Sequence, residues 1–177
     1  LLSSKNLDVV NIKINELIKL NDKRKKIEIS IIDEIDFTKI KDENKEVVIY
    51  YKPNINEGLI GIIAARLKDY FNKPSIVITN SNNLLKGSAR SIYSYNIGRA
   101  IKNSINKNII VTGGGHNMAA GFILEKSKLR DFENFIINDF INTGILTNNN
   151  FTYDAEVSYL AFNQNFLEDI KKLEPFG

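Results

Sequence analysis

Residues 46–79 contain two apolar strands separated by a single helix. The first strand covers residues 46–51 (EVVIYY), the helix covers residues 59–71, and the second strand covers residues 75–79 (SIVIT). Two strands joined by one crossover helix lie parallel to each other, and the crossover is right-handed. This unit predicts an α/β fold in which helices flank a mixed, partly parallel sheet.

Further elements of the same two kinds follow this unit. The apolar patterns predict strands at residues 84–93, 108–111 and 121–125 and helices at residues 96–106 and 128–140. A polar run at residues 147–150 (TNNN) indicates a boundary. Beyond it we expect a strand at residues 151–157 and a short helix at residues 166–173.

The chain begins with a long segment, residues 5–43, that contains no glycine or proline. Apolar residues recur there at spacings of three and four, which predicts one long helix or two helices in series. The basic run at residues 22–26 is interpreted as a solvated helix surface, with nucleic-acid contact as the alternative. A long helix in this position is typical of a connector between two domains.

Three consecutive glycines, Gly113, Gly114 and Gly115, stand directly before His116, the only histidine of the chain. Each glycine costs roughly 0.5–1 kcal/mol relative to alanine in a regular element, so the run indicates a sharp turn or a close approach to the backbone. One interpretation is a backbone cradle for an anion, with His116 at its rim. The alternative is a glycine-rich turn with an incidental histidine.

A second glycine-containing segment, residues 86–91 (KGSARS), falls in the strand expected at residues 84–93. Alternation along a strand puts Ser88 and Arg90 on the same side. A hydroxyl and a planar guanidinium side by side can bind a phosphate, although an ordinary surface arginine is the alternative. In residues 57–66 (EGLIGIIAAR), the small residues indicate close helix packing, and the N-terminus of that helix also attracts anions.

Composition limits the remaining chemistry. The chain has 177 residues, no cysteine and a net charge of +3. Disulfides and thiolate metal sites are therefore excluded, and no close group of Asp, Glu and His resembles a metal site. No apolar run approaches the roughly 18–20 residues that span a bilayer, and the first residues do not have the order of a signal peptide. We expect a cytoplasmic protein, and a piece of a longer one because the chain does not begin with methionine.

The order of five segments closely resembles the RecJ family of single-strand-specific 5′→3′ DNA exonucleases. The segments are EGLIGIIAARL, NKPSIVIT, KGSARS, TGGGHNMAAGF and DAEVSYL…LEPFG, and together they cover almost the whole chain. The resemblance implies that residues 1–43 are a connecting helix, residues 44–146 a DHH-associated substrate-binding domain, and residues 147–177 the beginning of an OB-fold domain. The family's catalytic DHH domain is absent from this chain.

The resemblance also implies roles for individual residues. The three glycines and His116 correspond to the family's GGGH loop, which faces the metal site and binds the substrate phosphate, so that His116 is the expected catalytic residue. Gly87, Ser88 and Arg90 correspond to the segment that binds the 5′ end of the DNA. The family's Mn²⁺ or Mg²⁺ is held by the DHH domain, and we expect no metal ligand within this chain.

One turn departs from the family pattern. Where RecJ proteins usually have Trp-His-Glu/Pro-Gly, this chain has Ile55-Asn56-Glu57-Gly58. The resemblance does not assign any contact to this turn, because the family's tryptophan and histidine are missing.

The expected function is substrate binding within a metal-dependent exonuclease that hydrolyses phosphodiester bonds of single-stranded DNA in recombination and repair. The expected partners are single-stranded DNA and other repair proteins, such as a single-strand-binding protein or a helicase. One alternative is a DHH-family phosphodiesterase for oligonucleotides or cyclic dinucleotides, against which the segment DAEVSYL…LEPFG counts. The other is a non-catalytic nucleic-acid-binding module. By itself the chain is expected to be inactive.

Overall fold

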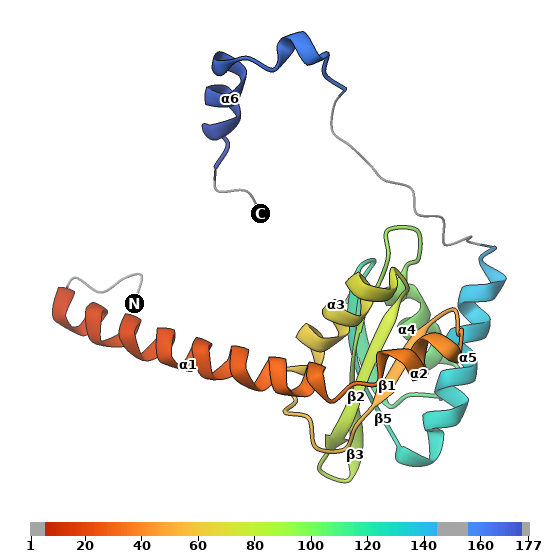
Figure 1. Cartoon of the computed structure of the whole chain (residues 1–177). Helices are drawn as coiled ribbons and strands as arrows, with labels where there is room; N and C mark the ends of the chain where they lie inside the picture. Colours follow the sequence, from red (N-terminus) through yellow and green to blue (C-terminus); the bar gives the residue numbers. More distant parts are fainter. Residues whose placement is uncertain (1–5, 145–155, 175–177) are drawn as a thin grey trace. The chain divides into compact units, whose positions relative to one another are not determined.

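The computed structural model describes residues 6–144 and 156–174 (Figure 1). The chain divides into two compact units, Leu1–Thr147 and Asn148–Gly177. Among the described residues of the second unit, the short helix α6 spans Gln164–Lys171 and follows a 3-10 turn, Tyr159–Ala161. The predicted helix at residues 166–173 is thereby confirmed, whereas most of the strand predicted at residues 151–157 lies outside the described residues. None of the helices in the described ranges is long and apolar enough to cross a membrane.

The first unit is built on a five-stranded mixed sheet with the strand order β1-β2-β3-β5-β4. Its strands are β1 (Val48–Tyr51), β2 (Ser75–Ser81), β3 (Leu84–Arg90), β4 (Thr112–His116) and β5 (Ala119–Leu124). Strands β1 and β2 are parallel, and every other neighbouring pair is antiparallel. The predicted α/β fold with a partly parallel sheet is therefore confirmed.

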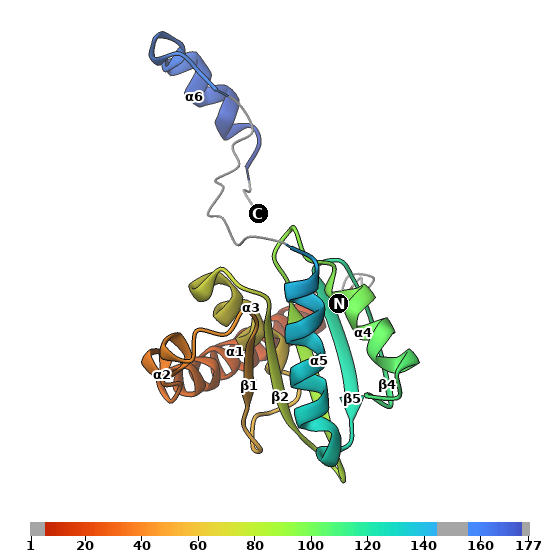
Figure 2. The same ribbon diagram turned by 90° about the vertical axis from the view of Figure 1, so that its right-hand side faces the viewer.

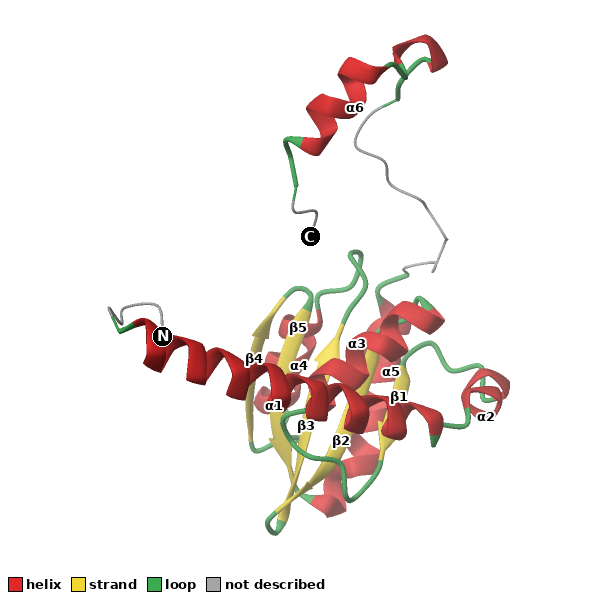
Figure 3. Cartoon of the chain, turned by 60° about the vertical axis from the view of Figure 1, so that its left-hand side comes forward, coloured by secondary structure: helices red, strands yellow, loops and turns green. Residues whose placement is uncertain are grey.

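Helices cover the two faces of this sheet unequally. The helices of the first unit are α1 (Leu7–Asp33), α2 (Phe37–Asp42), α3 (Ile60–Phe71), α4 (Ile97–Asn106) and α5 (Leu129–Asn142). Helices α4 and α5 lie together on one face (Figure 2) and pack into a core with Ile76, Leu85 and Phe122. Helix α3 lies on the other face, where a second core surrounds Val77 (Figure 3). Strand β2 is buried on both faces because it lies between these two cores.

The N-terminal segment forms two helices in series, which was one of the two expected outcomes. Helix α1 ends at Asp33, and Asp36 begins α2 by accepting a hydrogen bond from the backbone N–H of Lys39 at 2.9 Å. Helix α1 packs against α3, and its N-terminal half runs away from the sheet (Figure 1).

The prediction of a strand at residues 108–111 is wrong: strand β4 begins at Thr112 instead. Asn108 adopts a left-handed conformation with φ of 54°, and the N–H of Ile109 donates to the carbonyl of Ser104, so these residues turn off the end of α4. Ile110 is buried in the core while Val111 is exposed. The glycines that were expected in a turn form strand β4 itself, at an edge of the sheet.

Candidate nucleic-acid interface

The face of the sheet that carries α3 also carries most of the residues predicted to bind substrate. Across β3, β5 and β4, one row of directly paired residues is Ser88, Gly121 and Gly114, and the next row is Arg90, Ala119 and His116. Directly paired residues share a face of the sheet. Helix α3 covers β2 and β3, and Gly114, Gly121 and His116 remain exposed. We call the surface formed by these two rows the open face; its β3 end lies under α3 and its β4 end is exposed.

Ser88 and Arg90 meet at the covered end of the open face. Arg90 Nη1 donates to Ser88 Oγ at 3.3 Å and to the carbonyl of Ala89 at 3.0 Å. Both residues are half-buried. In the part of the chain that the structure describes, no carboxylate forms an ion pair with Arg90. A half-buried guanidinium without a carboxylate beside it is suited to bind an anionic group of a ligand.

The first turn of α3 lies directly over this pair. A Cβ atom placed on Gly61 would lie 3.1 Å from Ser88 Oγ and 3.1 Å from Arg90 Nη2. The sequence predicts close helix packing for the small residues of this segment, and Gly61 makes that close approach to Ser88 and Arg90. Since a helix N-terminus carries partial positive charge, this turn favours an anion beside Arg90.

The three glycines of β4 alternate between the two faces of the sheet: Gly113 and Gly115 lie on the face that carries α4, and Gly114 lies on the face that carries α3. A Cβ on Gly113 would lie 2.9 Å from Ile101 Cγ2, and a Cβ on Gly115 would lie 2.5 Å from Ala120 Cα, whereas a Cβ on Gly114 would meet nothing within 4 Å. Gly113 and Gly115 therefore permit close packing of β4 against α4 and β5. Because successive N–H groups of a strand point in opposite directions, the run does not form the expected cradle of converging amides.

Gly87 lies on the opposite face from Ser88 and Arg90. A Cβ at this position would overlap the ring of Phe122, with 2.1 Å between the Cβ and Cζ. The structure thus brings Ser88, Arg90, Gly114 and His116 onto one face but separates Gly87 from them.

His116 ends β4 and is exposed. Its Nδ1 accepts a long hydrogen bond of 3.4 Å from the backbone N–H of Met118, so that Nε2 is the ring nitrogen that can donate to a ligand. The following turn is held by α4: Asn96 Nδ2 donates to Asn117 Oδ1 at 2.7 Å, and the N–H of Ile97 donates to the carbonyl of Asn117 at 3.2 Å. The histidine is therefore held on a fixed turn and remains accessible.

Arg90 and His116 stand at opposite ends of one row with β5 between them. Neighbouring strands lie about 4.8 Å apart, so the two backbones are roughly 10 Å apart. The row can contact two different parts of one extended ligand. Gly121, which sequence analysis did not assign to the site, lies in the middle of this surface, and only the strand register shows that it belongs there.

In the turn that departs from the RecJ pattern, residues 55–58, side-chain oxygens accept hydrogen bonds from backbone N–H groups. Asn56 Oδ1 accepts a hydrogen bond from the N–H of Gly58 at 2.9 Å, and Thr79 Oγ1 accepts one from the N–H of Ile55 at 3.1 Å. Beside it, Lys86 pairs with Glu57 at 2.8 Å, and the hydrogen bond from Lys86 lowers the pKa of the Glu57 carboxyl.

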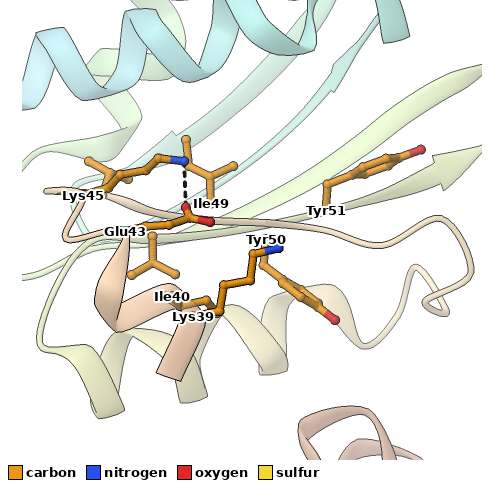
Figure 4. Close-up of a pocket in the computed structure, with 9 residues that line it drawn as sticks. Lys39, Ile40, Glu43, Lys45, Ile49, Tyr50 and Tyr51 are labelled. Carbon is orange, nitrogen blue, oxygen red and sulfur yellow. Dashed lines mark ion pairs between the residues drawn. The ribbon is translucent and has the colours of Figure 1, made fainter. Parts of the chain in front are cut away.

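A separate hollow of about 230 Å³ lies between α2 and β1, at the sheet edge opposite β4 (Figure 4). The pair Lys45–Glu43, 2.8 Å long, lies in this hollow, and the hydrogen bond from Lys45 lowers the pKa of the Glu43 carboxyl. None of the predicted site residues lines it.

Within residues 6–144 and 156–174, no three His, Asp or Glu side chains lie close enough together to hold a metal ion. These residues do not fit a catalytic metal.

Known proteins are similar to this chain over most of its length. The DHHA1 domain matches residues 44–142. The single-stranded-DNA-specific exonuclease RecJ of Haemophilus influenzae is 31% identical over 173 residues, which cover 92% of this chain and 30% of that protein. RecJ of Bacillus subtilis is 30% identical over 169 residues, which cover 92% of this chain and 21% of that protein. The chain thus spans less than a third of the length of these relatives.

Solved structures agree on the fold. The crystal structure of RecJ in complex with Mn²⁺ from Thermus thermophilus matches 98% of this chain and 26% of that chain, with a TM-score of 0.74 and 19% sequence identity. The corresponding Mg²⁺ complex matches 78% of this chain and 21% of that chain, with a TM-score of 0.64 and 19% identity.

Proposed function

The chain belongs to the DHHA1 domain family, and we propose that it is the substrate-binding part of a RecJ-like, 5′→3′ single-stranded-DNA exonuclease acting in recombination and repair. The relatives from Haemophilus influenzae and Bacillus subtilis are named single-stranded-DNA-specific exonucleases. The observation that carries the proposal is the row in which Arg90 and His116 lie at the two ends of one open sheet face.

In this proposal the open face holds the 5′-terminal part of a single strand. Arg90, assisted by Ser88 and the first turn of α3, binds the 5′-phosphate through charge-assisted hydrogen bonds. Gly114 and Gly121 present bare backbone, so the sugar-phosphate chain can lie close to the sheet. His116 donates from Nε2 to the phosphate that is cleaved and is the catalytic residue of this chain.

The proposal assigns the Mn²⁺ or Mg²⁺ of the reaction to a DHH domain of the intact protein, outside this chain. RecJ structures have been solved with both ions. When bound, such a metal activates water and neutralises phosphate charge. The residues described here bind and orient the DNA, and the isolated chain with Mn²⁺ is expected to release no nucleotides from single-stranded DNA. The proposal places the protein in the cytoplasm, with single-stranded DNA and other repair proteins as its partners.

The test compares Arg90→Ala with Arg130→Ala in the 177-residue chain. Arg130 is an exposed arginine of α5, on the other face of the sheet, and serves as the matched control. A charge-assisted contact contributes roughly 1.5–3 kcal/mol, so Arg90→Ala should weaken binding of 5′-phosphorylated single-stranded DNA about tenfold to a hundredfold. Binding of DNA with a 5′-hydroxyl should change much less, and Arg130→Ala should affect neither.

Equal losses on the two DNAs would make Arg90 a general backbone contact and place the 5′-end pocket elsewhere. No loss on either DNA would contradict the proposed interface.

A further inference from the structure

Helix α1 joins the domain through a small contact region. The helix has 27 residues and is therefore about 40 Å long. Of these residues, all of which are described, Glu28 alone is buried, with 5% of its surface exposed. Toward the N-terminus most apolar residues are exposed, with exposed fractions between 42% at Ile14 and 75% at Leu7, and Val10 is half-buried. A buried carboxylate at the point where a long helix meets its domain calls for an explanation.

Glu28 connects the two helices through a chain of polar contacts. Its Oε2 accepts from Arg24 Nη1 at 3.0 Å, and its Oε1 accepts from Arg66 Nε of α3 at 2.9 Å. Arg24 is held in turn, because its Nε donates to Asn21 Oδ1 at 3.1 Å. Both carboxylate oxygens are thus engaged, one within α1 and the other across to α3.

Apolar contacts in the same region hold α1 to the domain without fixing its direction. Ile31 and Ile32 are half-buried and pack against the core that includes Ile35 and Ile63. Burial of apolar surface is non-directional, whereas the hydrogen bond from Arg66 of α3 to Glu28 is directional and restricts the orientation of α1 relative to α3. The bond from Arg24, which lies within α1, fixes the position of the carboxylate that accepts it.

The direction of α1 has consequences for the open face. Helix α3 covers the sheet face that bears Ser88 and Arg90, and α1 packs on α3, so α1 leaves the domain on the side of the candidate site. The distance from Glu28 to Leu7 along the helix is about 30 Å. A tilt of about 10° at Glu28 therefore moves the far end by roughly 5 Å, whereas a misplacement of about 1 Å can cost a reaction about a hundredfold in rate.

We propose that Glu28, held between Arg24 and Arg66, is a positioning residue that sets the direction of α1 relative to the open face. Its catalytic consequence rests on the proposed function: α1 would carry the metal-binding domain, and Glu28 would fix how that domain meets the DNA held at Arg90 and His116. Glu28 touches neither the DNA nor the reacting atoms.

The first experiment measures the direction of the helix. The chain contains no cysteine, so Asn11→Cys on α1 and Lys102→Cys on α4 give one defined pair of spin labels. The parent should show one narrow distance distribution. Glu28→Gln should at least double its width, and so should Arg66→Gln, which removes a side chain that is 64% exposed and therefore leaves the fold intact. Glu16→Gln is the matched control, because Glu16 pairs with Lys13 on the exposed surface of the same helix.

The second experiment measures single-turnover cleavage and DNA affinity in the full-length protein. Glu28→Gln and Arg66→Gln should lower kcat about tenfold or more, while the Kd for single-stranded DNA stays within about twofold of the parent. Glu16→Gln should change neither quantity.

Each result decides one part of the proposal. Unchanged narrow distances in both variants would overturn the anchoring role of Glu28. Broadened distances with an unchanged kcat would overturn its role in catalysis and leave the proposed function standing, since that function is tested separately at Arg90. If the full-length parent does not cleave DNA, the proposed function falls, and the distances alone decide the anchoring role.

Discussion

On one face of the sheet α4 and α5 bury every second residue of β3 and β5. On the other face α3 covers β2 and β3, whereas Gly121 of β5 and the residues of β4 on that face are exposed. Strand β3 shows the difference within seven residues. Leu85 and Ala89 are buried in the core, whereas Ser88 and Arg90 lie on the face that carries α3. A shift of one residue along a strand therefore separates the core residues from those of the proposed binding surface.

Strand β4 shows the same difference within three glycines. At Gly113 and Gly115, on the face that carries α4 (the closed side), neighbouring atoms leave no room for a Cβ atom, whereas the space beside Gly114 is empty. Identical residues in one short run therefore have different reasons to be there. Substitution should have opposite effects at neighbouring positions.

The largest expected effect is on catalysis at the open face. His116→Ala in the full-length protein should lower kcat about 10²–10³-fold, because the loss of one preorganised donor to a reacting phosphate typically costs that much. DNA affinity should change little if this contact strengthens only as charge develops. Single-turnover rates, DNA binding and a thermal melt of the same preparation check this. A normally folded variant that cleaves at the parent rate would make His116 an incidental residue.

A smaller effect, on stability, is expected at the closed side of the same strand. The Cβ of Gly115→Ala would lie 2.3 Å from the carbonyl oxygen of Ala119, so the backbone of β4 or β5 must move. Overpacking of this kind typically costs about 1–3 kcal/mol. Urea unfolding of the 177-residue chain should show this loss of stability. An unfolding curve in urea that is indistinguishable from that of the parent would contradict the packing described for β4.

The smallest expected effect has the opposite sign. Gly114 does not have a positive φ and has open space beside it, so Gly114→Ala should stabilise the chain by about 0.4–1 kcal/mol. The same variant should bind single-stranded DNA about fivefold more weakly, which corresponds to roughly 1 kcal/mol, because its methyl group occupies the surface offered to the ligand. A stabilised variant with unchanged affinity would remove Gly114 from the interface.

The sequence predicted the features that depend on local pattern. The parallel pair of β1 and β2 follows from the strand–helix–strand unit, and alternation along β3 was enough to place Ser88 and Arg90 on one side. The prediction of a strand at residues 108–111 was wrong because it relied only on the β propensity of Ile109, Ile110 and Val111. Tertiary packing overrides that propensity, and the register of β4 is set by its contacts with α4 and β5.

The features that the sequence did not predict join distant residues. Arg66 and Glu28 are 38 positions apart, and Gly61 approaches Ser88 from a different element. Gly121 joins the open face only through the pairing of β5 with β3 and β4. No periodicity within one segment contains this information. Asp36, by contrast, was a detectable signal for the start of α2, because aspartate is a preferred N-cap residue.

The most direct test of the central claim is to map where single-stranded DNA contacts the 177-residue chain. Titration of the ¹⁵N-labelled chain with a short 5′-phosphorylated oligonucleotide should shift the backbone amide signals of Ser88, Arg90, Gly114 and Gly121. The amides of α5, behind the sheet, should remain unchanged. Shifts confined to α4 and α5, or to the basic residues 23–26 of α1, would contradict the account and place the interface on another surface.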